Sequence, residues 1–296
     1  MTTIKTTVRK KTNAGKSTRD LPRPFLKWAG GKGQLVDDLL ALVPRHFNNY
    51  YEPFLGGGAL FFAMYRKGLL EDKDVHLSDI NTELMYTYLS IKEDLQSVVR
   101  KLKSHKYEKN YYYKIRSQDP SKLFPDILAA RMIFLNKTGF NGLYRVNSMG
   151  FFNVPFGRYK NPQICDKENL KAVSRALEGV DIHITSFENI LNIVRRGDFV
   201  YLDPPYVPMS ETAHFVGYHQ NGFGADDQER LAQVFEKLDG RGVHVMLSNS
   251  DTPWVRKRYK AFRQVRFDAR RSINSKAGLR GPVGELVIIG NATSSN

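Results

Sequence analysis

The chain has 296 residues, of which 41% are apolar and 12% aromatic, enough for one large α/β domain or for such a domain with a sizeable insertion. Its 45 Lys and Arg outnumber 30 Asp and Glu, and the net charge of +15 favours a polyanionic partner such as nucleic acid. A single cysteine, Cys165, excludes an internal disulfide and a Cys-rich zinc module, and the histidines fit no zinc-ligand spacing, so we expect no metal. No apolar run approaches the ~18 residues of a membrane span, which predicts a soluble protein of a reducing compartment.

Residues 1–20 are rich in Thr, Lys and Arg and almost free of large apolar side chains. This composition is typical of a disordered, solvated tail. It also suits a basic arm that lies along phosphates, and both interpretations stay open.

From Pro24 onwards the apolar residues become periodic. Their spacing predicts a helix over 35–43 and helical stretches over 82–102 and 226–238. Short β-like runs alternate with helical stretches, which predicts a mainly parallel sheet with helices on both faces and ligands bound beyond the carboxyl ends of the strands. The five runs are 76–78, 182–185, 199–202, 243–247 and 285–289.

Residues 100–160 differ in character from the rest. They hold thirteen Lys and Arg against three Asp and Glu, a net charge of +10, together with twelve Tyr and Phe. Within them, 143–146 and 151–155 flank Asn147-Ser148-Met149-Gly150, which predicts a β-hairpin with a four-residue loop. A basic, aromatic insertion with a projecting hairpin suits a DNA-reading module, although an ordinary basic helical subdomain would share this composition.

The tetrapeptide Asp203-Pro204-Pro205-Tyr206 directly follows the apolar run 199–202, at the carboxyl end of a predicted strand. The N6 lone pair of adenine is delocalised into the ring, so this amine is a poor nucleophile. The Asp203 carboxylate and the Pro204 carbonyl could accept its two hydrogens and free the lone pair, while the prolines keep the turn rigid. Tyr206 offers a face on which an extruded base can stack. The structural alternative is a stiff turn with an exposed Asp and a core Tyr.

A glycine segment, Glu52-Pro53-Phe54-Leu55-Gly56-Gly57-Gly58, precedes the apolar residues 59–62. Its glycines permit a tight turn and a close approach of the backbone to a ligand, although such loops often serve packing alone. Asp79 falls 21 residues after Gly58, where a carboxylate can accept hydrogen bonds from both ribose hydroxyls of a nucleoside. Together they predict a nucleoside-containing cofactor.

The segment Lys27-Trp28-Ala29-Gly30-Gly31-Lys32-Gly33 also precedes a predicted helix. Because Gly33 follows Lys32 and the glycine spacing differs from Walker A, we exclude an NTPase phosphate loop. Lys32 near a helix N-terminus suits a carboxylate equally well. Trp28 belongs either to this site or to the core.

Taken together, these segments resemble the Dam-type DNA adenine-N6 methyltransferases (alpha group, D12 class). The resemblance extends from about Pro24 to Ile289 and involves a series of segments in the same order. These segments are 25–32, 52–54, 79–81, 141–145, 153–160, 203–206, 247–249 and 271–273.

The resemblance implies an α/β fold of the Rossmann-like, AdoMet-dependent methyltransferase type, with an inserted, largely helical DNA-recognition domain that carries the hairpin. We expect a tail at 1–20, a catalytic domain at 21–95 and 180–296, and a target-recognition domain at 96–179. The implied donor is S-adenosylmethionine (AdoMet) and the implied partner is double-stranded DNA, with no membrane and no metal. We expect a monomer on DNA. We also expect it in the cytoplasm, associated with the nucleoid, as a bacterial or a phage enzyme.

The resemblance also implies roles for single residues. Catalysis and base flipping fall to Asp203, Pro204, Pro205 and Tyr206. The expected AdoMet-binding residues are Trp28, Lys32, Phe54, Gly56, Gly58, Asp79 and Asp203. The expected DNA-binding residues are Lys27, Phe140, Asn141, Leu143, Arg145, Pro155 and Arg158.

Among the DNA-binding residues, Lys27 and Arg145 fall where the family has guanine-reading side chains, and cations can bond O6 and N7 of guanine in the major groove. Leu143 and Pro155, on the two arms of the hairpin, could touch a thymine methyl group. Phe140 replaces a frequent Tyr, so its ring can still wedge into DNA without the hydroxyl bond.

The implied reaction is methylation of N6 of adenine in duplex DNA, within GATC. The alternatives are the same chemistry at another short site, a cytosine-N4 enzyme, a protein-glutamine enzyme and a basic DNA-binding protein without catalysis. Cytosine-N4 enzymes more often carry Ser in place of Asp203, and protein-glutamine enzymes carry Asn and lack so basic an insertion. Housekeeping, restriction–modification and phage enzymes share these motifs, which therefore do not separate the three roles.

Overall fold

A computed structural model describes residues 21–207, 223–270 and 282–294 of the chain. The basic segment 1–20 and the segment 271–273 lie outside these residues. The two interpretations of the basic segment therefore stay predictions.

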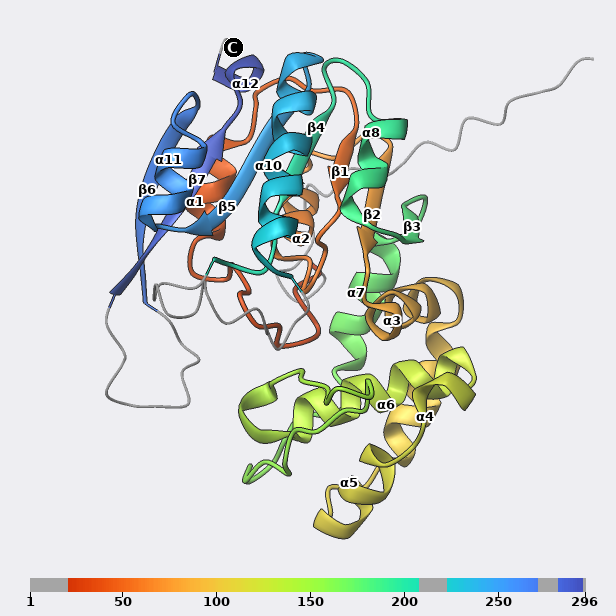
Figure 1. Ribbon diagram of the computed structural model, residues 1–296. Coiled ribbons are helices and arrows are strands. Elements are labelled where there is room, and N and C mark those ends of the chain that lie inside the picture. The colour runs from red at the N-terminus through yellow and green to blue at the C-terminus, as the bar shows by residue number, and fades with distance from the viewer. Residues whose placement is uncertain (1–20, 208–222, 271–281, 295–296) are drawn as a thin grey trace, which may run out of the picture.

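The described residues form a seven-stranded sheet in the order β3-β2-β1-β4-β5-β7-β6 (Figure 1). Neighbouring strands from β3 to β5 run parallel, β7 is antiparallel to β5, and β6 is antiparallel to β7. This topology confirms the predicted α/β class with a mainly parallel sheet. The strands are β1 (Tyr50–Glu52), β2 (Val75–Asp79), β3 (Asp181–Ile184), β4 (Phe199–Leu202), β5 (His244–Ser250), β6 (Arg263–Arg270) and β7 (Pro282–Ile289).

Each of the five predicted strands corresponds to an observed one, whereas β1 and β6 were missed. Strand β1 has only three residues, and its charged Glu52 interrupts the apolar pattern. Strand β6 carries Arg263 and Arg266 among its apolar residues, which conceals the alternation of a half-buried edge strand.

Helices cover both faces of the sheet, because the central strands are apolar on both sides. In β4, Phe199 and Tyr201 pack into one apolar cluster, and Val200 and Leu202 pack into the other. Figure 1 shows α10 and α8 over one face and α2 behind the other. The helices of this part are α1 (Val36–Leu42), α2 (Ala59–Arg66), α8 (Ile190–Ile193), α10 (Ala225–Gly240), α11 (Pro253–Arg258) and α12 (Asn291–Ser294).

A second body of helices extends below the carboxyl edge of the sheet (Figure 1). It contains α4 (Leu95–Ser104), α5 (Lys109–Arg116) and α6 (Pro125–Thr138), and α3 (Thr82–Glu93) and α7 (Lys167–Ala176) lie between it and the sheet. The stretch 82–102, predicted as one helical segment, is divided at Asp94. This residue has a non-helical φ of −142° and caps α4 by accepting a hydrogen bond from the Ser97 amide.

The predicted hairpin is present as an antiparallel pair with isolated bridges rather than two full strands. Val146 bridges Phe152, the Asn147 amide donates to the Phe151 carbonyl, and the Asn153 amide donates to the Arg145 carbonyl. The hairpin rests on an apolar cluster shared with α5 and α6. The boundaries 96–179 of the recognition domain stay a prediction.

Among the described residues, no helix combines the length and the apolar character that crossing a membrane requires.

The helical body is held to α3 by Arg131, a buried charge in α6. Its side chain is 1% exposed and forms an ion pair of 3.1 Å with Glu83 in α3. The guanidinium also donates to the carbonyls of Ile115, Arg116 and Gln118 at the end of α5. One side chain therefore joins three helices.

We predict that Arg131→Ala lowers the free energy of unfolding by about 3 kcal/mol or more, because it leaves the Glu83 carboxylate uncompensated and carbonyls without a donor. Urea denaturation measures this effect. In the control Lys171→Ala, which removes an exposed pair with Glu168, the loss should stay below about 1 kcal/mol. Equal losses for the two variants would contradict the role given to Arg131.

Candidate active site and nucleic-acid interface

The candidate residues from distant parts of the chain meet at the carboxyl edge of the parallel strands. Pro53 follows β1, Asp79 ends β2, Asp203 follows β4 and Ser250 ends β5. These four strands are consecutive in the sheet, in the order β2-β1-β4-β5. The edge is where open α/β sheets bind their ligands.

The glycine segment and Trp28 form one packed unit. Gly56 and Gly58 have φ values of 47° and 66°, a left-handed conformation that favours glycine. A Cβ at Gly56 would also lie 2.7 Å from the Trp28 ring. The Trp28 ring also stacks on Tyr144, with 5.0 Å between the ring centroids. Trp28 is therefore partly buried between the loop and the hairpin, in accord with both interpretations of this residue.

Asp79 is held in a defined orientation at the end of β2. Its two oxygens accept hydrogen bonds from the amides of Gly56 and Asn81, at 3.0 and 2.9 Å. Burial raises the pKa of the Asp79 carboxyl, and these backbone hydrogen bonds oppose the rise. Each oxygen keeps a lone pair for a further donor, such as a ribose hydroxyl. The next residue, Ile80, has 75% of its surface exposed and presents apolar area beside this carboxylate.

Phe54 belongs to a group of three aromatic rings on the other side of the loop. It stacks on Phe187, with centroids 5.3 Å apart, and meets Phe223 edge-on at 5.7 Å. Phe187 and Phe223 were not expected from the sequence. This group gives the site an apolar wall.

Lys32 and Asp203 form the central ion pair of the site. The Lys32 ammonium lies 2.5 Å from Asp203 Oδ1, donates to the Gly30 carbonyl at 2.7 Å, and lies 4.6 Å from the centre of the Tyr206 ring. The side chain of Lys32 is 3% exposed and that of Asp203 is 20% exposed. Burial raises the pKa of Asp203 above its ordinary value, and the Lys32 ammonium opposes that rise.

The turn after β4 is held by a buried network of amide side chains. The Pro205 carbonyl accepts a hydrogen bond from Gln228 Nε2, and Asn249 Oδ1 accepts one from the Val207 amide. Asn249 and Gln228 are also bonded to each other at 3.1 Å. None of the described residues donates to the Pro204 carbonyl, which leaves this acceptor available to a ligand.

Two further carboxylates lie close to the Lys32–Asp203 pair. Glu52, which is buried, accepts a hydrogen bond of 2.7 Å from Tyr50, and burial raises its pKa to about 8. Glu285 in β7 lies 3.9 Å from the Lys32 ammonium, and burial raises its pKa as well. Two carboxylates, Asp203 and Glu285, therefore lie within 3.9 Å of the Lys32 ammonium, and Glu52 is a third carboxyl group nearby. In the part of the chain that the structure describes, no His, Cys, Asp or Glu side chains form a group of three or more that could hold a metal ion.

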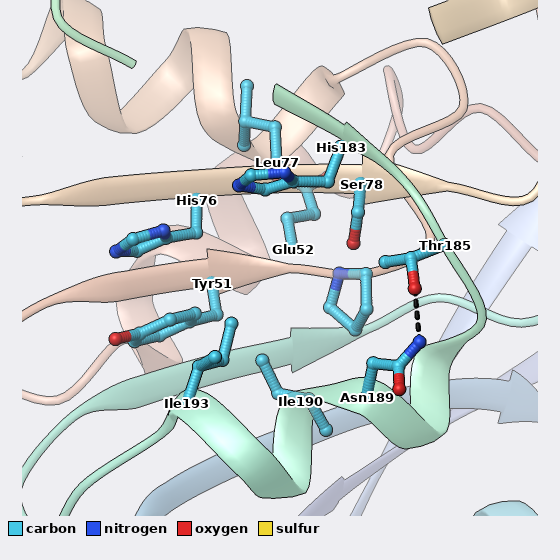
Figure 2. A pocket seen from close by; sticks show the side chains of 11 residues that line it. Tyr51, Glu52, His76, Leu77, Ser78, His183, Thr185, Asn189, Ile190 and Ile193 are labelled. Carbon is cyan, nitrogen blue, oxygen red and sulfur yellow. Dashed lines mark hydrogen bonds between the residues drawn. The ribbon is translucent and has the colours of Figure 1, made fainter. Parts of the chain in front are cut away.

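A small cavity under the sheet edge is too small to be the cofactor site. It has a volume of about 30 Å³ and is lined by residues of β1, β2, β3 and α8, with Glu52 among them (Figure 2). Tyr51 and His76 stack at its rim, with centroids 4.5 Å apart. Nucleoside pockets are on the order of ten times larger, so this space suits about one water molecule.

Several of the expected DNA-binding residues are adjacent in the structure. A Cβ at Gly142 would meet the Lys27 side chain at 2.4 Å, so Lys27 packs directly on the segment that precedes the hairpin. The Phe140 amide donates to the Pro155 carbonyl at 2.8 Å. The Arg145 guanidinium is exposed and bonds Asn153 Oδ1 at 2.6 Å, which fixes its direction across the hairpin.

The remaining DNA-binding candidates differ in exposure. Asn141 is exposed and has a left-handed φ of 55°, and Arg158 is exposed as well. Leu143 is half-buried in the hairpin cluster. The exposed candidates therefore have side chains available to a partner, whereas Leu143 offers only part of its surface.

Four residues of the site escaped the sequence analysis: Gln228, Glu285, Phe187 and Phe223. Gln228 occupies an ordinary position on the buried face of α10, and no sequence signal marks it. Glu285 had a signal, since it is a lone charge beside an apolar run. We placed it at the start of a strand, whereas β7 begins three residues earlier.

Comparison with known proteins identifies the family of this chain. The family model described as D12 class N6 adenine-specific DNA methyltransferase matches residues 28–273. The type II methyltransferase M1.LlaDCHI of Lactococcus lactis subsp. cremoris is 42% identical over 274 residues, which are 90% of this chain and 94% of that protein. The type II methyltransferase M.MjaIII of Methanocaldococcus jannaschii is 43% identical over 87% of this chain and 95% of that protein. The DNA adenine methylase of Escherichia coli (strain K12) is 34% identical over 90% of this chain and 95% of that protein.

These matches set aside the cytosine-N4 enzyme, the protein-glutamine enzyme and the DNA-binding protein without catalysis. They also agree with the expected methyl donor, because enzymes of this family use AdoMet. The chain belongs to the D12 class of N6 adenine-specific DNA methyltransferases.

Proposed function

We propose that this enzyme methylates the adenine of GATC in duplex DNA, and that it flips this adenine out of the helix into the turn Asp203-Pro204-Pro205-Tyr206. The site GATC rests on the resemblance of the sequence motifs to Dam-type enzymes. The single observation that carries the catalytic proposal is the Lys32–Asp203 pair at the sheet edge, beside a rigid proline turn.

The residues at the sheet edge fit each part of AdoMet. Asp79 has lone pairs for the ribose hydroxyls, and the exposed Ile80 and the Phe54 ring offer apolar surfaces for the nucleobase. Lys32 uses two of its donors within the chain and keeps a third for the methionine carboxylate. The loop from Gly56 to Gly58 and the Trp28 ring would line the path between them. When bound, AdoMet supplies an electrophilic methyl group on its sulfonium sulfur.

Asp203 and Pro204 would make the adenine amine nucleophilic. The carboxylate accepts one N6–H and the Pro204 carbonyl accepts the other, so the lone pair is withdrawn from the ring and becomes available to form the new N–C bond. Methyl transfer would leave the nitrogen with one proton too many, and the Asp203 carboxylate that accepts its hydrogen bond would take up this proton and release it to solvent. Tyr206 stacks on the flipped ring, and the Gln228–Asn249 network prevents the turn from relaxing.

The helical body would recognise the DNA. We propose residues 96–179 as the target-recognition unit of an enzyme that acts as a monomer on DNA in the cytoplasm or nucleoid. Lys27 and Arg145 would read guanines, Leu143 and Pro155 would touch a thymine methyl group, and Phe140 would wedge into the helix near Asn141. We place Arg158 on a phosphate.

The catalytic assignment is tested by Asp203→Ala, which should reduce methyl transfer by at least about 100-fold, because the N6 acceptor is lost. DNA affinity should stay close to that of the wild type, since the base readers are unchanged. Transfer of labelled methyl groups and fluorescence anisotropy measure the two effects. Turnover near the wild-type rate would show that Asp203 is not the acceptor.

Base reading is tested by Arg145→Ala, which should cost about 1–3 kcal/mol of discrimination between GATC and sites that differ at one guanine. The ratio of kcat/KM on the two sites gives this free energy. Full retention of the preference would assign Arg145 a structural role with Asn153 instead.

Phosphate binding is tested by the salt dependence of DNA affinity. The basic insertion predicts a steep fall of log K with log salt, and Arg158→Ala should make the slope shallower by about 1 while leaving the site preference unchanged. A flat titration for the wild type would mean that the positive charge serves another partner.

A further inference from the structure

Glu285 is a buried carboxylate that the proposed mechanism does not use. It lies in β7, with Ser250 of β5 and Phe267 of β6 as its neighbours across the sheet. Its side chain is 9% exposed, and its Oε1 atom makes no hydrogen bond among the described residues. Burying a carboxylate oxygen without a hydrogen bond costs free energy, so such oxygens usually have a donor. The groups next to Glu285 are therefore the candidates for this donor.

Two groups of the active site face this carboxylate. The Lys32 ammonium lies 3.9 Å from Glu285 Oε1, only 1.4 Å farther than from Asp203 Oδ1 at 2.5 Å. The Tyr206 hydroxyl is buried and likewise has no hydrogen-bond partner among the residues that the structure describes. It is close enough to Glu285 for the two groups to shift each other's pKa. Glu285 therefore lies beside both the cation and the aromatic ring of the adenine pocket.

The chemistry proposed for Asp203 requires such a neighbour. In the structure Asp203 Oδ1 accepts a short hydrogen bond from Lys32, so part of its acceptor capacity is already used. An ammonium that is 97% buried cannot move away from Asp203 unless another anion receives it, because an unpaired buried charge is strongly unfavourable. Glu285 is placed to receive it.

We propose that Glu285 is a positioning residue that shares the Lys32 ammonium with Asp203 and accepts the Tyr206 hydroxyl, so that Asp203 can turn its carboxylate to the adenine amine. This inference rests on the proposed role of Asp203. No covalent bond forms or breaks at Glu285. A shift of Lys32 from one carboxylate toward the other leaves the charge of the site unchanged.

The pH dependence of the reaction reports on this arrangement. Among the described residues, six titratable groups surround Asp203: Lys32, Glu52, Glu285, Tyr50, Tyr201 and Tyr206. Only Lys32 is cationic, and it favours the ionised form of Asp203. The negative charge of Glu285 disfavours that form and draws Lys32 away. Loss of the Glu285 charge should therefore lower the pKa of Asp203.

The test compares single-turnover methyl transfer by the wild type, Glu285→Gln and Glu285→Asp over a range of pH. In Glu285→Gln, Lys32 loses its second carboxylate neighbour and stays on Asp203, so the plateau rate should fall by about 10- to 100-fold, as when a reacting group is mispositioned. The rate falls at low pH as Asp203 is protonated, and this fall, the acid limb of the pH profile, should move to lower pH in the variant. Glu285→Asp keeps the charge and should restore the position of the limb. Glu93→Gln, which removes an exposed carboxylate on α3, is the matched control and should match the wild type in both respects.

The outcomes separate this proposal from the proposed function. A wild-type profile without an acid limb would contradict the role of Asp203 itself. A normal wild-type limb that does not move in Glu285→Gln would overturn the role of Glu285. Affinity for AdoMet and the melting temperature are measured alongside, and a rate loss that only follows a loss of folding would overturn the proposal as well.

Discussion

The contact between the Lys32 ammonium and the Asp203 carboxylate joins two segments that are 171 residues apart in the chain. Each partner has its own support. Lys32 donates to the Gly30 carbonyl in the same loop, and Asp203 follows β4, which is buried on both faces. The glycine segment packs against Trp28, four residues before Lys32, so the loop that carries the ammonium is also fixed to the end of β1. The geometry of the site thus depends on this pair, which joins the Lys32 loop to the end of β4.

The charges around this pair determine which ligands the site favours and how strongly its carboxylates accept hydrogen bonds. Asp203 and Glu285 are two carboxylates beside one ammonium, whereas burial raises the pKa of Glu52 to about 8, so that Glu52 is mostly protonated at neutral pH. A sulfonium donor is cationic, so a site with an excess of carboxylates favours its approach. The same excess makes each carboxylate a stronger acceptor than an exposed one would be. The same carboxylates would then favour both the binding of the methyl donor and the activation of the adenine amine.

The sequence predicted the parts of the molecule that have a local cause. Asp203 could be placed at a strand end because four apolar residues precede it. The glycines at 56–58 predicted a tight turn, because glycine adopts backbone angles that other residues avoid. Strands β1 and β6 could not be recognised, since a three-residue strand and an edge strand with arginines lack a clear period. The division at Asp94 was missed because the apolar spacing continues across it.

The missing parts of the site depend on contacts over long distances. Gln228 braces the Pro205 carbonyl from a helix 23 residues away, and Glu285 reaches Lys32 from the opposite end of the chain. Neither relation leaves a local pattern. Arg145 shows both kinds of relation. A local sequence motif predicts that it reads guanine, whereas its hydrogen bond to Asn153 is visible only in the folded hairpin.

The proposed mechanism depends on Lys32 keeping Asp203 ionised in a buried site. The most direct measurement is the pH profile of single-turnover methyl transfer by Lys32→Gln, at AdoMet concentrations that saturate the variant. Because the ammonium lowers the pKa of Asp203, its removal should move the acid limb to higher pH. An acid limb at the wild-type position, with transfer still taking place, would contradict the account.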